Sequence, residues 1–334
     1  MRRKVVKHAT RRRATSTCSD RPATAWRPVD RNGLRVLQAA PLARHDWLVH
    51  GFSTRVGGAS KLGNERVLNL GYTKWDSHAA VEANRRSFLA ALGAEGMTLV
   101  TLRQIHSDVI HEVTAAPGHS PRGLSRSGQG PLRGDALITR ARGLLLAIQT
   151  ADCIPILLAD PKHRAVAAVH AGWRGTLKRI AAKTLGRMRM LFGTRPGDVM
   201  AVLGPAIGRC CYEVGPEVVQ AFAGQFAGAA EWFTAPAPSP RDRSAPTFEQ
   251  LATGQEPMPL KWLTMAPPGH EPPAPRLYLD LFAANLWQLL DAGLPSENVV
   301  VSDLCTACRT DLLFSHRREQ GHTGRQMGVI GIRM

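Results

Sequence analysis

The chain of 334 residues is poor in aromatic side chains, in cysteine and in long apolar runs. No apolar stretch reaches the roughly 20 residues that a transmembrane helix needs, so we expect a soluble protein. Six cysteines at uneven spacing are too few for a disulfide framework. Aromatic residues make up 6% of the chain, which gives little support to a protein that stacks nucleic-acid bases.

Acidic residues are also scarce, with 26 Asp and Glu against 43 Lys and Arg, for a formal net charge of +17. Residues 1–30 contain nine basic and two acidic residues and so carry +7 of this charge. We interpret them as a basic disordered tail, with a mitochondrial transit peptide as the alternative, and we do not expect nucleic acid as a partner. Because residues 1–13 lack the apolar segment of a secretory signal, we expect a cytoplasmic protein.

From residue 31 to residue 334, short apolar strands that end in polar residues alternate with a few helices. Helices are predicted at residues 77–92, 177–192 and 279–292. Segments rich in glycine or proline at about 117–133 and 235–275 are interpreted as insertions. We therefore expect a single compact α+β (mixed α/β) domain, in which mixed sheets are flanked by helices and the site lies at strand ends.

Two buried strands, predicted at residues 144–148 and 165–169, each end in a polar cluster. Asp152 and Cys153 follow the first strand, and His170 follows the second. If the two strands pair, a thiol and an imidazole lie close together on rigid elements. Each residue alone is more often a packing residue, but the two together favour a metal or catalytic site.

His106 follows another predicted strand, within the sequence Gln-Ile-His-Ser. With Cys153 and His170 it would supply two imidazoles and a thiolate, a set that suits Zn²⁺ and leaves a fourth position open. Cu²⁺ is the alternative ion, because its affinity for such ligands exceeds that of Zn²⁺. A multicopper laccase needs paired H-x-H motifs, and the sequence contains none.

Four further cysteines lie near the carboxyl-terminal half. Cys210 and Cys211 are adjacent and would point apart in a strand, so we interpret them as packing residues. Cys305 and Cys308 form a C-x-x-C pair without a second such pair, which we interpret as two buried or free thiols.

Seven motifs occur in order between about residues 45 and 333. They are Phe52–Gly58, Gln104–Ser107, Gly134–Thr139, Ala151–Pro155, His170–Gly175, Leu203–Gly208 and Phe314–Arg318. Together they resemble the laccase-domain family, the polyphenol-oxidase-like proteins also called purine nucleoside phosphorylases or peptidoglycan-editing factors.

The resemblance implies a zinc site formed by His106, Cys153 and His170. It also implies phosphorolysis of adenosine, inosine and S-methyl-5′-thioadenosine, together with hydrolytic deamination of adenosine. The expected partners are thus a purine nucleoside and phosphate, with no membrane.

Phosphorolysis needs a bound phosphate, which arginines recognise in bidentate fashion. The candidates, in falling order, are Arg55, Arg174 and Arg317, and the alternative for each is a surface or interface ion pair. Asp152 is a candidate base, with the orientation of a ligand as its alternative role.

Three other functions stay open at this point. The family resemblance also allows a copper-dependent polyphenol oxidase. Cys153 could instead be the nucleophile of a hydrolase that edits peptidoglycan precursors, with His170 or His106 as its base. A nucleic-acid binder would use the basic tail, and truncation of residues 1–30 would then abolish binding.

Overall fold

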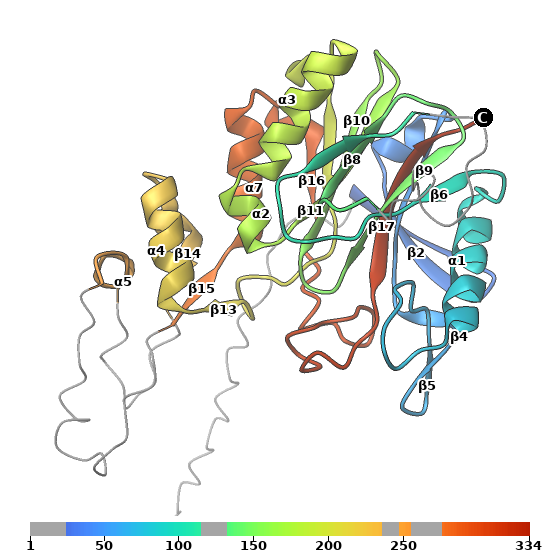
Figure 1. Ribbon diagram of the computed structural model, residues 1–334, viewed down its shortest axis with the longest axis horizontal. Coiled ribbons are helices and arrows are strands. Elements are labelled where there is room, and N and C mark those ends of the chain that lie inside the picture. The colour runs from blue at the N-terminus through green and yellow to red at the C-terminus, as the bar shows by residue number, and fades with distance from the viewer. Residues whose placement is uncertain (1–24, 115–131, 236–246, 255–275) are drawn as a thin grey trace, which may run out of the picture.

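The computed structural model describes residues 25–114, 132–235, 247–254 and 276–334, and Figure 1 shows its arrangement. Two six-stranded sheets are stacked face to face, and helices cover their outer faces. Each sheet contains both antiparallel and parallel neighbours. The expectation of mixed sheets flanked by helices in one compact domain is confirmed.

The first sheet has the strand order β1-β2-β3-β17-β9-β6. Its strands are β1 (Trp26–Arg31), β2 (Leu34–Ala39), β3 (Leu48–Ser53), β17 (Gln326–Ile332), β9 (Leu144–Thr150) and β6 (Thr98–Val100). The second sheet has the order β16-β12-β10-β11-β8-β7. Its strands are β16 (Val299–Val301), β12 (Met200–Leu203), β10 (Ile154–Asp160), β11 (Ala165–Ala171), β8 (Ala136–Thr139) and β7 (Ile110–Glu112).

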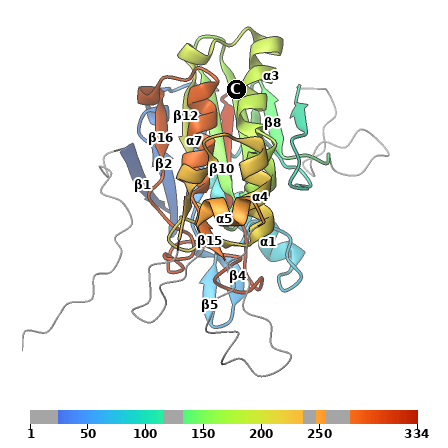
Figure 2. The ribbon, with the colours of Figure 1, turned by 90° about the vertical axis from the view of Figure 1, so that its left-hand side faces the viewer.

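Two small sheets and several short turns complete the fold. They are β4 (Val56–Leu62) with β5 (Glu65–Val67), and β13 (Glu213–Val214), β15 (Leu277–Leu279) and β14 (Phe233–Thr234). Turns of 3-10 helix lie at Leu42–Arg44, Pro196–Asp198, Ala229–Trp232 and Ser296–Asn298. Figure 2 shows α4 (Pro216–Gln225), α5 (Phe248–Ala252) and β15 on the same side of the molecule.

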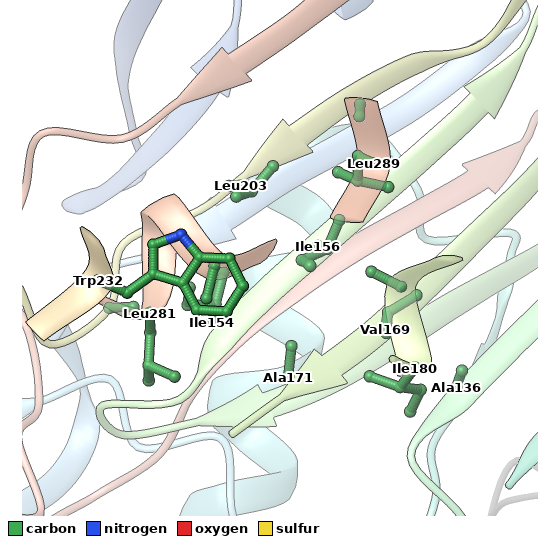
Figure 3. Packing of buried hydrophobic residues seen from close by; sticks show 14 of the residues in the cluster. Ala136, Ile154, Ile156, Val169, Ala171, Ile180, Leu203, Trp232, Leu281 and Leu289 are labelled. Atoms are coloured by element: carbon green, nitrogen blue, oxygen red, sulfur yellow. The ribbon is translucent and has the colours of Figure 1, made fainter. Parts of the chain in front are cut away.

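Apolar side chains fill the space between the two sheets and under the helices. Leu146, Leu157 and Ile330 belong to the layer between the sheets. Figure 3 shows the second sheet's outer face, where Ile156 and Val169 lie in the same cluster as helix residues such as Leu289. Because both faces of the central strands are covered, those strands are apolar at nearly every position rather than at alternate ones.

Helix α1 (His78–Leu92) corresponds to the helix predicted at residues 77–92 and is capped at both ends. The Ser77 side chain accepts a hydrogen bond from the Ala80 N–H, and Gly93 closes the helix at φ 61°. The helix predicted at residues 279–292 is α7 (Leu281–Asp291), whose first turn is capped by Asp280. None of the helices in the described parts of the chain combines the length and the apolar character that a bilayer crossing requires.

The helix predicted at residues 177–192 starts earlier and is broken. Residues Trp173–Leu177 form α2 and Ile180–Phe192 form α3. Between them Arg179 adopts φ 59°, a left-handed conformation that a continuous helix cannot contain.

Two of the boundaries predicted from the sequence need correction, and a third cannot be compared with the structure. Residues 1–24 of the predicted tail lie outside the described residues, but Trp26–Arg31 form strand β1, paired with β2. The predicted insertion at 117–133 falls almost wholly outside them as well. Within the predicted insertion at 235–275, Phe248–Ala252 form helix α5, which Thr247 and Gln250 cap with a capping box. The helix is too short to show a periodic apolar pattern in the sequence.

Candidate active site

The two central strands do not pair with each other, although their polar ends do meet. Strand β9 belongs to the first sheet and β11 to the second, so they face each other across the core. The neighbours of β11 are β8 and β10, and the sequence analysis missed β10 because Pro155 stands near its start. Pro155 pairs with His170 in the register of this ladder. Cys153 stands two residues before Pro155, directly before β10, and therefore lies beside the imidazole.

His106 lies in the loop that follows β6 and has a left-handed backbone at φ 57°. The side chain of Gln104 fixes this loop to strand β9. Its Nε2 donates to the Gln149 carbonyl at 2.7 Å, and its Oε1 accepts from the Gln149 N–H at 2.9 Å.

Asp135, at the start of β8, joins the His106 loop to His170. Its carboxylate accepts hydrogen bonds from the backbone N–H groups of Ile105, His106 and Ser107, and from the Ser107 hydroxyl at 2.7 Å. The Nδ1 atom of His170 lies 2.8 Å from the same carboxylate. Since Nδ1 is engaged there, Nε2 of His170 is left to act as a ligand.

The structure brings together the three predicted metal ligands. One ligand atom each from His106, Cys153 and His170 lies within 4.8 Å of the other two. The Cys153 Sγ is 4.0 Å from His106 Nε2, and the two imidazole centroids are 5.0 Å apart at 72°. Three convergent ligands of nitrogen and sulfur form a group that can hold a metal ion with an open fourth position.

Gly172 leaves the space that this convergence needs. A Cβ atom at this position would lie 2.8 Å from Cys153 Sγ and 3.2 Å from His106 Cδ2. A side chain of any size is therefore incompatible with the present positions of the thiol and the imidazole.

The charges of the site reinforce one another. Burial alone would raise the pKa of the Cys153 thiol, but the neighbouring His170 and His106 lower it to about 6. Burial would likewise lower the pKa of His170, but Cys153 and Asp135 raise it to about 9. Despite its burial, the pKa of Asp135 lies below its ordinary range because His170 and Ser107 donate to the carboxylate. Without a metal, the site thus favours a thiolate next to an imidazolium.

A pocket of about 480 Å³ opens over these ligands, a size typical of small-molecule sites. Its other lining residues are Leu102, Gln104, Gln149, Thr150, Ala151, Asp152, Trp173, Arg174, Tyr212, His316, Arg317 and Arg325. Aromatic surface from Trp173 and Tyr212 and positive charge from three arginines therefore surround the ligand group.

Two of the three predicted phosphate-binding arginines line this pocket. The Arg174 guanidinium lies 4.3 Å from the Trp173 ring centroid, and no carboxylate in the described parts of the chain lies within ion-pair distance of it. The Arg317 guanidinium lies over Tyr212 at 5.4 Å and donates to the Glu213 carbonyl at 2.7 Å.

Arg55, the first of the predicted phosphate-binding arginines, is not brought to the pocket. It is 7% exposed, and its guanidinium is engaged by the Glu319 carboxylate at 2.9 Å, the Thr310 carbonyl at 2.8 Å and the Phe314 ring. This is the ion-pair alternative, so Arg55 holds the segment before β17 in place.

Asp152 lines the pocket wall, but both oxygens of its carboxylate are already engaged. Oδ1 accepts from the Thr306 hydroxyl and Oδ2 from the Arg317 N–H, each at 2.6 Å. Its backbone has φ 91°, which is rare for a residue with a side chain. The contacts fit the orienting alternative better than the role of a free base.

Sequence reasoning missed Asp135, Tyr212 and Arg325 as parts of the site. The available signal for Asp135 was its position directly before an apolar strand. A carboxylate there is expected to be buried, and a buried carboxylate needs several hydrogen-bond donors around it. Arg325 stands in a polar loop before the last strand, and burial lowers its pKa. Nothing local in the sequence marks Tyr212 as a pocket residue.

The two stacked mixed sheets, with a pocket at their edge lined by two histidines and a cysteine, define an α+β protein with a candidate metal site. The family model described as "Multi-copper polyphenol oxidoreductase laccase" matches residues 49–255 and 258–333. The chain belongs to this laccase-like family, as the motifs predicted.

Relatives with assigned names are similar over most of their length. The purine nucleoside phosphorylase YlmD of Geobacillus stearothermophilus is 35% identical over 290 residues, which cover 85% of this chain and 90% of the relative. A purine nucleoside phosphorylase of Deinococcus radiodurans is 35% identical over 304 residues, 90% of this chain and 94% of the relative. Adenosine deaminase RL5, from an unknown prokaryotic organism, is 30% identical over 280 residues, 83% and 91% respectively.

Solved structures share the fold. The hypothetical protein YfiH of Bacillus licheniformis matches with a TM-score of 0.72 at 29% identity, covering 92% of this chain and 99% of that chain. YlmD of Geobacillus stearothermophilus matches with a TM-score of 0.67 at 32% identity, covering 91% and 98%.

Proposed function

We propose that this protein is a zinc-dependent purine nucleoside enzyme. It would phosphorolyse adenosine, inosine and S-methyl-5′-thioadenosine and would deaminate adenosine by hydrolysis. The observation that carries the proposal is the convergence of His106, Cys153 and His170 at a pocket that also contains free arginine charge. Relatives named purine nucleoside phosphorylase and adenosine deaminase support both reactions.

The ligand set supports zinc. Two imidazoles and one thiolate suit a borderline-soft ion, and Asp135 holds His170 in the tautomer that such binding needs. Zinc held there would supply the Lewis acidity that lets water react near neutral pH. His106, Cys153 and His170 would be its ligands, and the thiolate form of Cys153 favours binding at neutral pH.

The arginines are assigned to the phosphate. In phosphorolysis a phosphate oxygen bonds to the ribose C1′ while the bond from C1′ to the purine nitrogen breaks, and the purine leaves with a proton. Arg174 and Arg317 would hold the phosphate, because their guanidinium groups line the pocket and can offer paired donors. Trp173 and Tyr212 would supply the apolar surface against which the purine packs.

Asp152 is assigned to positioning. The Asp152 carboxylate accepts hydrogen bonds from Thr306 and from the backbone of Arg317, and so fixes the segment that carries Arg317 to the part of the pocket that carries Cys153.

The deamination reaction follows a different course from phosphorolysis. Water adds at the purine C6 of adenosine and ammonia leaves.

Adenosine turnover with and without phosphate tests the proposal. Wild-type protein should release adenine only when phosphate is present and inosine in either case. Cys153→Ala and His170→Ala should each lower both rates by on the order of 100-fold or more, together with the bound zinc. His163→Ala is a matched control, since His163 also bonds to a buried aspartate, Asp160, at 2.8 Å but lies outside the pocket. Equal rates in all four proteins would show that the reaction occurs elsewhere.

Two alternatives make different predictions at the same site. A hydrolase with Cys153 as nucleophile would be active without metal and inactivated by thiol alkylation, whereas bound zinc should protect the thiol. A copper-dependent phenol oxidase agrees with the description of the family, and it would need copper and oxygen for phenol turnover. The absence of H-x-H pairs in the sequence weighs against a multicopper centre.

A further inference from the structure

Four cysteines that the sequence analysis interpreted as packing residues or free thiols lie together in the structure. Cys210 and Cys211 are not in a strand, as that interpretation assumed, but in a turn after β12, where Cys211 and Tyr212 both donate to the Gly208 carbonyl. A turn allows neighbouring side chains to point the same way. Cys305 and Cys308 lie after β16.

The sheet topology explains the meeting of these two loops. Strands β12 and β16 are parallel neighbours, so their carboxyl ends reach the same edge of the second sheet. Ala206 and Cys305 continue the pairing as an isolated parallel bridge, in which the Thr306 N–H donates to the Ala206 carbonyl at 3.0 Å. The backbone thus fixes the two cysteine pairs beside each other.

The sulfur positions match a tetrahedral metal site. The Cys308 Sγ lies 3.6 Å from that of Cys210 and 3.4 Å from that of Cys211, and all four sulfurs lie within 4.8 Å of one another. A tetrahedron with zinc–sulfur bonds of about 2.3 Å has edges of about 3.8 Å. An iron–sulfur cluster places inorganic sulfide between the cysteines and needs a wider spacing.

The surrounding backbone suits thiolates. The Gly208 N–H donates to the Cys305 sulfur at 3.2 Å, and a Cβ at Gly208 would lie 3.3 Å from both Cys210 Sγ and Cys305 Cβ. A glycine is therefore the residue that lets this donor approach. Cys305 is buried, whereas Cys210 and Cys308 are exposed, so an ion has access from solvent.

We propose that Cys210, Cys211, Cys305 and Cys308 bind one structural Zn²⁺, separate from the His106, Cys153 and His170 group. Four protein ligands leave no position open for water or substrate, which is the composition of a structural rather than a catalytic site. The ion joins the turn after β12, which carries Tyr212 to the pocket wall, to the segment after β16, in which Thr306 holds Asp152.

Metal content of single variants tests the site. Wild-type protein purified without added metal should contain two zinc equivalents per chain, and Cys308→Ser and Cys153→Ala should each lose one. Cys18→Ser, the remaining cysteine of the chain, is the matched control and should keep both. Cys153→Ala removes a ligand of the His106, Cys153 and His170 group only. The zinc content of the four-cysteine site can therefore be measured even if the proposed catalytic zinc is absent.

X-ray absorption at the zinc edge of Cys153→Ala protein adds a test that does not depend on the folding of Cys308→Ser. The remaining zinc should show four sulfur neighbours at about 2.3 Å. Three results would overturn the proposal: no zinc in Cys153→Ala protein, a neighbour shell with nitrogen or oxygen, or a disulfide within the group found by thiol counting under native conditions.

Discussion

At the scale of single residues, Asp135 organises the site although its side chain does not line the pocket. One buried carboxylate accepts from three successive backbone N–H groups, a hydroxyl and His170. We expect Asp135→Asn to weaken zinc binding by about 10- to 100-fold, because the neutral amide orients and polarises the imidazole less well. Competition with a chromogenic chelator measures this loss.

Asp160→Asn is the matched control for this prediction. Asp160 is also fully buried and also binds an imidazole, that of His163, at 2.8 Å, but it lies at the far end of β10. Its substitution should lower stability and leave zinc affinity unchanged. Similar zinc affinities in the two variants would mean that Asp135 has only a folding role.

At the scale of elements, the turn from β11 into α2 decides whether the metal ligands can meet. Gly172 has an ordinary extended backbone, at φ −80° and ψ 175°, so alanine is permitted there by conformation alone. Its methyl group would nevertheless lie 2.8 Å from Cys153 Sγ. We expect Gly172→Ala to fold but to lose zinc from this group and with it adenosine turnover, as metal analysis and activity assays would show.

The same substitution in a neighbouring element has the opposite expectation. Gly186 lies inside helix α3, and a Cβ there would meet nothing within 4 Å. Gly186→Ala should raise the free energy of unfolding by about 0.5–1 kcal/mol and leave metal content unchanged. Full zinc retention in Gly172→Ala would show that Cys153 or His106 moves aside at little cost.

At the scale of the whole molecule, acid stability depends on a histidine away from the site. His50 in β3 is 2% exposed, its Nε2 accepts from the Ala39 N–H at 3.0 Å, and burial lowers its pKa from 6.5 to about 4. Between these values the unfolded chain binds the proton and the folded chain does not. Stability is therefore retained above pH 6.5 and falls as the pH drops toward 4, by about 3 kcal/mol.

Urea unfolding across this pH range checks the prediction. His50→Gln keeps an acceptor for the Ala39 N–H but cannot be protonated, so its stability should change less with pH than that of the wild type. His322→Gln removes an exposed histidine and should leave the wild-type slope unchanged. Parallel curves for wild type and His50→Gln would exclude His50 as the group responsible.

Local patterns in the sequence were sufficient for much of the fold. The cap residues Ser77 and Gly93, the apolar spacing of helices α1 and α7, and the continuous apolar runs of the buried strands all depend on neighbours within a few residues. Strand β10 was missed because proline is typical of strand ends and edges, although here Pro155 stands at the second position of the strand, before the pairing with β12 begins at Ile156.

The candidate site was predictable in its ligands but not in its supports. A thiol and two imidazoles at strand ends are recognisable as possible metal ligands by residue type, so His106, Cys153 and His170 were chosen from the sequence. Arg55 was ranked above Arg174, because the local sequence does not distinguish a free arginine from one that forms an ion pair. The structure shows that the charge of Arg55 is already neutralised, by Glu319 far along the chain at 2.9 Å and by Glu65 at 3.4 Å.

The sequence by itself determined many of the helices and strands and which side chains have metal-binding chemistry, because propensity, capping and ligand type are local properties. The tertiary structure alone decided that β9 faces β11 rather than pairing with it, and that β12 and β16 bring four cysteines to one edge. Such neighbours follow from how two sheets bury their apolar faces together, an energy shared by the whole core that no local segment records.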